Sequence, residues 1–124
     1  SNEVYKGVMA GKSKGVFNGK VLVDENIRHV KASQNSNNLL LSDVAEINTK
    51  PELEIYSDDV SCAHGATVGQ LDADSIFYLR ARGIPEIVAK KMLVEAFLEE
   101  ALSQLPLESV KTEVMKIISK SNTL

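Results

Sequence analysis

The strongest constraint on the fold is a change of residue pattern near position 71. Before it, short β-branched runs alternate with glycine, proline, aspartate and asparagine, which is typical of successive strands and turns. After it, apolar residues recur at helical spacing. Strands followed by segregated helices indicate an α+β protein. We therefore expect one domain over residues 1–71 and a helical domain over residues 72–124.

The first part contains several short predicted strands. Residues 33–38 are polar and are predicted to form a loop ahead of a run of three leucines. In residues 52–56 apolar and acidic residues alternate, so Leu53 and Ile55 are predicted to point inward. The predicted strands cover residues 15–23, 39–41, 44–49, 53–56, 60–64 and 66–71.

Three helices are predicted in the second part. Asp72 or Asp74 can cap a first helix that Gly83 stops, Pro85 suits the first turn of a second, and Pro106 ends that one. On a helical wheel the second helix has one apolar stripe, and further apolar residues fall outside it: the stripe is Ile87, Val94, Leu98, Ala101, Leu102 and Leu105, and the others are Val88, Met92, Leu93 and Phe97. The helix is therefore apolar on more than one side, and we expect a further surface to cover it. The sheet also begins without a capping element. We therefore expect this chain to be a fragment of a larger protein.

Composition narrows the classes of partner. Fourteen lysines and arginines against seventeen acidic residues give a net charge of −3 over 124 residues, which predicts no nucleic-acid or anionic-membrane partner. The longest apolar runs have three or four residues, so no membrane span is predicted. A single cysteine and no apolar leader segment indicate a reducing compartment, and we expect a cytoplasmic protein.

Residues 7–13 (GVMAGKS) imitate a phosphate-binding loop. The glycines of such a loop are separated by four residues, whereas here there are three, and the following residues predict a strand where that loop opens a helix. We therefore expect no nucleotide to bind this chain. Asp58 and Asp59, adjacent in sequence, are interpreted as a turn and not as a pair of catalytic carboxylates.

The segment that contains Cys62 and His64 carries the side chains best suited to metal binding or catalysis. In a strand, residues two apart share a face and lie roughly 6.5 to 7 Å apart. Thiolate and imidazole are ligands for zinc, iron and iron–sulfur clusters. A lone cysteine is, however, commonly a small buried apolar residue, and the only other histidine, His29, is distant in sequence. If a metal binds here, another subunit must supply the remaining ligands.

Together these segments resemble the SufB/SufD family of iron–sulfur cluster assembly proteins. The resemblance rests on VSCAHGATVGQLD at residues 60–72 and FYLRARGI at residues 77–84, and the upstream residues 15–20, 34–42 and 51–60 also fit it. It covers residues 4–102. Gly65 follows the histidine where SufB carries an acidic residue, so the segment is more similar to the SufD branch.

The resemblance implies a fold and a set of partners. It implies the final coils of a right-handed parallel β-helix followed by a C-terminal helical domain. A SufB-like subunit would join through the β-helix, and a SufC-like ATPase would dock on the C-terminal helices. The chain would be a non-catalytic scaffold. Exposed sheet edges also lead us to expect that the isolated fragment can form a homodimer.

The resemblance also implies a site. His64, and less strongly Cys62, would help to hold an iron–sulfur cluster transiently at the SufB–SufD interface, where His64 faces a cysteine of SufB. The alternative from another class is a carbohydrate-active or acyl-transfer enzyme on a β-helix. Such an enzyme needs clustered carboxylates, a catalytic arginine or lysine, or a hexapeptide repeat, and we find none of these in the sequence.

Overall fold

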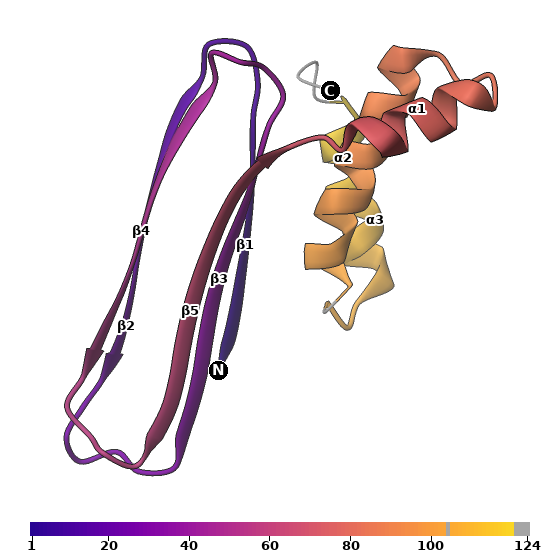
Figure 1. Cartoon of the computed structure of the whole chain (residues 1–124). Coiled ribbons are helices and arrows are strands. Elements are labelled where there is room, and N and C mark those ends of the chain that lie inside the picture. The colour runs from indigo at the N-terminus through magenta and orange to yellow at the C-terminus, as the bar shows by residue number, and fades with distance from the viewer. Residues whose placement is uncertain (104, 121–124) are drawn as a thin grey trace. The chain divides into compact units, whose positions relative to one another are not determined.

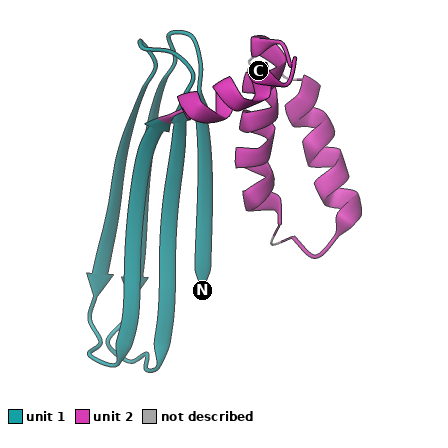
Figure 2. Cartoon of the chain, turned by 45° about the vertical axis from the view of Figure 1, so that its right-hand side comes forward, with its two compact units in different colours: residues 1–69 teal, residues 70–124 magenta. Residues whose placement is uncertain are grey.

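The computed structural model describes residues 1–103 and 105–120 and is an α+β protein with five parallel strands and three helices (Figure 1). It divides into two compact units, Ser1–Gly69 and Gln70–Leu124 (Figure 2), which are described separately below. The elements are β1 (Asn2–Met9), β2 (Lys14–Val23), β3 (Val30–Leu40), β4 (Glu46–Ile55), β5 (Val60–Gln70), α1 (Ala73–Ala81), α2 (Glu86–Leu102) and α3 (Glu108–Lys120).

The strands form two sheets between which the chain passes repeatedly. One sheet has the order β1-β3-β5 and the other pairs β2 with β4. Asn2 pairs with Ser33 and Lys14 with Glu46, both in parallel register, so each full pass takes 31 or 32 residues. The apolar core of this unit is small. It includes the buried Val23, Ala32, Leu39 and Ala45, together with a ring contact between Tyr5 and Phe17.

Charged pairs link β2 and β4, one between residues in register and one to a residue two positions further along β4. Lys14 Nζ lies 3.0 Å from Glu46 Oε2 and Lys20 Nζ lies 2.6 Å from Glu54 Oε1. The hydrogen bond to Glu54 raises the pKa of Lys20. These pairs are exposed and contribute little stability each.

Two predictions about the extent of the strands are wrong. Residues 33–38 are not a loop but the middle of β3, because their polar side chains alternate and Gln34, Ser36 and Asn38 are buried. Residues 44–49 and 53–56 are not two strands, since a single strand, β4, spans Glu46–Ile55. Pro51 is tolerated within it because β4 is an edge strand, where a missing N–H need not leave a neighbour unpaired.

Two further predictions, one about β5 and one about the inward side chains of β4, hold only in part. Residues 60–64 and 66–71 are one strand, β5, which continues through Gly65. The inward prediction holds only in part for β4: Leu53 is half-buried, but Ile55 is 40% exposed. Ile55 is the last residue of an edge strand, so no described strand continues the sheet over it.

The helical unit follows the sequence signals closely. The backbone N–H of Ser75 donates to Asp72 Oδ2 at 2.9 Å and caps α1, and the side-chain and backbone hydrogen bonds from Ser75 lower the pKa of Asp72. Gly83, at φ 87°, follows the end of α1. α2 begins after Pro85 and ends at Leu102, short of Pro106. Lys91 Nζ donates to the carbonyl of Ser119 at 3.1 Å and links α2 to α3.

Little of the helical unit is fully buried. In the described residues of this unit only Ala89 and Val94 are buried, while Ile87, predicted on the same stripe as Val94, is 76% exposed. Leu105, the last member of that predicted stripe, lies beyond the end of α2. None of the described helices is both long enough and apolar enough to cross a membrane.

Val94 is expected to be the main apolar anchor of the helical unit. Val94→Ala removes two fully buried carbon atoms and should lower the free energy of unfolding by about 2 kcal/mol. Ile87→Ala on the same helix is the matched control and should change it little, because that side chain is exposed. Urea unfolding followed by circular dichroism at the helix band measures both. Equal losses in the two variants would contradict this packing.

Candidate metal-ligand site on strand β5

Strand β5 is the edge strand that carries both candidate ligands. Its register against β3 follows from outward-facing contacts: Thr67 Oγ1 donates to Asn37 Oδ1 at 2.9 Å, and a side chain added at Gly65 would lie 3.1 Å from Asn35 Oδ1. Thr67 and Gly65 therefore lie beside Asn37 and Asn35. This register places His64 beside Gln34 on the neighbouring strand.

Alternation along the strand fixes the face of the candidate ligands. Asn35 and Asn37 alternate with Gln34, which is buried between the sheets, so His64 and Cys62 share the face of the buried row. Even so, His64 is exposed and Cys62 is half-buried. The reason is that β5 pairs only with β3, and no described strand lies along its other side.

The buried row of β3 is polar. Asn38 Nδ2 donates to Ser36 Oγ at 3.0 Å and to the carbonyl of Thr67 at 3.2 Å, which ties β3 to β5. Gln34 Nε2 donates to Glu3 Oε2 at 3.1 Å on the other side. Gln34 Oε1 is buried and has no hydrogen-bond partner. A buried polar atom without a partner is uncommon in a folded protein.

Glycines make room for this polar row. A side chain at Gly7 would overlap the Asn38 amide, and one at Gly19 would overlap the Gln34 amide. Gly7 lies on β1 in register with Asn38, whereas Gly19 lies on β2 in the facing sheet. This arrangement was not predicted from the sequence. The available signal was the polar residues at alternate positions 34, 36 and 38, which is strand periodicity and not loop composition.

The chemistry available to this chain alone is limited. Neither His64 nor Cys62 forms a side-chain hydrogen bond or ion pair with the described residues. Within residues 1–103 and 105–120, no group of three or more His, Cys, Asp or Glu side chains is arranged to hold a metal ion. Structural zinc sites use four protein ligands and catalytic ones three. An imidazole and a thiol on one exposed strand can thus contribute to a shared site but cannot complete one.

The second histidine is engaged elsewhere. His29 lies in the connection between β2 and β3, with the positive φ of 56°, and its Nδ1 lies 2.8 Å from Asp59 Oδ2. Asp59 lies just before β5. This contact joins two neighbouring turns, which agrees with the interpretation of Asp58 and Asp59 as turn residues. The structure does not bring His29 into a ligand group with Cys62 and His64.

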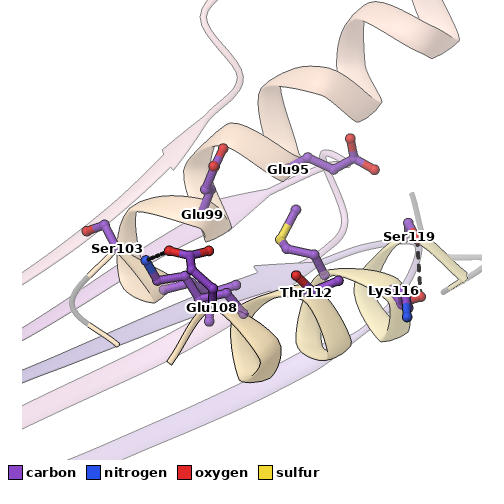
Figure 3. Close-up of a pocket in the computed structure, with 10 residues that line it drawn as sticks. Glu95, Glu99, Ser103, Glu108, Thr112, Lys116 and Ser119 are labelled. Carbon is purple, nitrogen blue, oxygen red and sulfur yellow. Dashed lines mark hydrogen bonds and ion pairs between the residues drawn. The ribbon is translucent and has the colours of Figure 1, made fainter. Parts of the chain in front are cut away.

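The helical unit has a separate hollow between α2 and α3 (Figure 3). It has a volume of about 630 Å³, with Leu102 and Met115 among its apolar lining residues. Lys111 Nζ lies 2.7 Å from Glu108 Oε1 at its rim. Elsewhere on this unit, large apolar side chains are exposed on all three helices, and they include Phe77, Tyr78, Ile87, Val88, Met92, Val110 and Ile117.

The chain thus has parallel strands that pass between two sheets, a last strand that carries the Cys-x-His segment, and helices after it. Comparison with known proteins identifies the class of protein to which it belongs. Residues 1–97 match the family described as "SUF system FeS cluster assembly, SufBD core domain". The chain therefore belongs to the SufBD family. The resemblance inferred from residues 60–72 and 77–84 is confirmed.

Individual relatives agree with this assignment. The chain is similar to an iron–sulfur cluster assembly SufBD family protein of Synechocystis sp., with 44% identity over 96% of this chain and 26% of the relative. The iron–sulfur cluster assembly protein SufD of Escherichia coli is 42% identical over 97% of this chain and 28% of its own length. SufD of Bacillus subtilis is 34% identical, covering 92% and 26%. The chain thus spans about a quarter of the length of these relatives.

Gly7→Ala is expected to disrupt the polar row. The added methyl group would overlap the Asn38 amide, which three hydrogen bonds hold in place, so we expect a loss of roughly 1–3 kcal/mol in the free energy of unfolding. Gly69→Ala on β5 is the control: nothing lies near its added carbon, and its effect should stay within about 0.5 kcal/mol. Chemical denaturation measures both. A neutral Gly7→Ala would contradict the described packing.

Proposed function

We propose that this chain is part of a SufD-like, non-catalytic scaffold subunit that acts in iron–sulfur cluster assembly with a SufB-like subunit and a SufC-like ATPase. Membership of the SufBD family and the similarity to two proteins named SufD support this proposal. The alternative, a carbohydrate-active or acyl-transfer enzyme, is not favoured, because nothing in these comparisons points to such chemistry.

The two sheets are proposed to be coils of a right-handed parallel β-helix. The chain returns to the same sheet after nearly constant intervals, and successive passes stack in parallel register. That regularity is typical of a solenoid. Parallel crossover connections are right-handed in nearly all proteins. The open edge at β5 would then be the end of the coil, available for a strand of another subunit.

His64 is proposed to act at that open edge. The observation that carries this proposal is an exposed imidazole, free of hydrogen bonds to the described residues, on an edge strand that pairs on one side only. The iron or nascent cluster is the substrate of the assembly, and His64 would supply one ligand to it while the SufB-like subunit supplies others. Cys62, half-buried and two residues away, would be an auxiliary ligand at most.

The helical unit is proposed to dock the SufC-like ATPase. A helical unit with only two fully buried side chains in its described part, and large apolar ones exposed on every helix, has apolar surface available for a partner. ATP-driven closure of the ATPase would pull on the helices after Asp72 and change the interface that holds His64. In this arrangement the scaffold couples a motion to cluster assembly without performing a bond-making step itself.

His64→Ala tests the role of the imidazole. In the full-length subunit, the variant should abolish complementation of a strain that lacks it, while the three-subunit complex still assembles on size exclusion. The matched control is His29→Ala, which removes the other histidine from a turn contact and should retain activity. Cys62→Ser should have a smaller effect than His64→Ala. Wild-type complementation by His64→Ala would refute the proposed role.

Phe77→Glu combined with Ile87→Glu tests the docking surface. Both side chains are more than 70% exposed, so the substitutions should leave the fold intact and weaken binding of the SufC-like ATPase at least tenfold, because charges replace apolar contacts. Val16→Glu, in an equally exposed apolar position on β2, is the control and should bind as the wild type does. Calorimetric titration measures each affinity. Unchanged binding by the double variant would exclude this surface.

A further inference from the structure

We propose that Gln34 is a positioning residue for His64: its Oε1 accepts a hydrogen bond from one ring nitrogen of His64 and so leaves the other nitrogen unprotonated and available as a ligand. This inference rests on the proposed function, because only under that function does His64 act as a ligand. The hydrogen bond itself is a separate claim about the chain, and it can be tested without any partner or metal.

The first support is the unsatisfied atom. Gln34 is 2% exposed, and its Oε1 is buried without a donor. The assignment of the amide atoms is fixed by Glu3, because only Nε2 can donate to the carboxylate oxygen 3.1 Å away. With Nε2 held toward β1, Oε1 is the amide atom left for the neighbours on the other sides. A buried acceptor of this kind favours any arrangement that brings it a donor.

The second support is the register. Glu3 pairs with Gln34 in register, and the contacts of Gly65 and Thr67 place His64 beside Gln34 on the other side. Neighbouring strands lie about 4.8 Å apart, so in-register side chains on one face are within reach of each other. Glu3, Gln34 and His64 therefore form a row across three strands, with the glutamine in the middle.

The third support is that the residues placed against the Gln34 amide, Gly19 and its register partner Pro51, offer no side-chain donor. The Gln34 amide packs against Gly19, which has no side chain. Gly19 pairs in register with Pro51, whose ring nitrogen carries no hydrogen. Glu3 already accepts from the same amide. Of these neighbours, His64 alone carries side-chain N–H groups, and its exposed ring makes no hydrogen bond with the described residues that would have to be broken first.

A hydrogen bond from His64 to Gln34 would determine which ring nitrogen of His64 can act as a ligand. A neutral ring has one N–H donor and one lone-pair acceptor, so a hydrogen bond to Oε1 at one nitrogen fixes the lone pair on the other. Metal-binding histidines in proteins ordinarily have such a partner at the second nitrogen. Glu3 in turn holds the glutamine amide in the orientation that presents its oxygen. The row would thus preset the tautomer before any partner arrives.

Nitrogen-15 NMR of the histidine ring tests this proposal in the chain itself. A His29→Gln background removes the other ring, so that the remaining signals belong to His64. At a pH where the ring is neutral, the native chain should show one tautomer and a ring N–H protected from solvent exchange. The same chain unfolded in urea should show the mixture of a free imidazole. Identical native and unfolded tautomer ratios in this chain would overturn the proposal, and this comparison needs no variant of Gln34.

Gln34→Met then tests the acceptor. Methionine keeps the length of the side chain without a hydrogen-bonding oxygen, so the His64 ring should revert to the unfolded-state ratio and lose its exchange protection. Ser36→Ala is the matched control: it removes a buried hydrogen-bonding group from the next inward position of β3 and should leave the ring unchanged. A restricted ring in Gln34→Met would also overturn the proposal. The complementation result for His64→Ala is independent of these signals, so the two claims can fail separately.

Discussion

Parallel pairing between successive passes of the chain is the constraint on which the rest of this unit depends. Each strand is held by residues about 31 positions away, so no single pass can fold by itself and every inward side chain is set by the register. The same pairing ends at β5, which has a neighbour on one side only. The exposure of His64 is a direct result: it lies on the face that buries Gln34, but nothing in the described chain covers it.

Local signals predicted the elements that local interactions control. The strand β2 and the capped helix α1 were recognisable because turn residues, Asp72 and Gly83 act within a few positions. Residues 33–38 were assigned to a loop because polar composition is ordinarily a surface feature. Here the glycines at 7 and 19, distant in sequence, leave space for those polar side chains inside. Such compensation depends on tertiary register and cannot be recognised within one segment.

In the candidate site too, local features could be predicted from the sequence and contacts set by strand pairing could not. Cys62 and His64 could be predicted from their spacing, because a strand places residues two apart on one face. The neighbours of His64 could not be predicted, since Gln34 and Glu3 precede it by 30 and 61 positions and meet only through pairing with β3.

The short connection between β5 and α1 has a mechanical consequence. The strand ends at Gln70 and the helix starts at Ala73, so only Leu71 and Asp72 separate them, and Asp72 already caps the helix. The backbone of a β-strand is already nearly fully extended and can lengthen very little. Tension applied to α1 would therefore be delivered along the backbone of β5 to the peptide groups around His64, without first straightening a flexible tether.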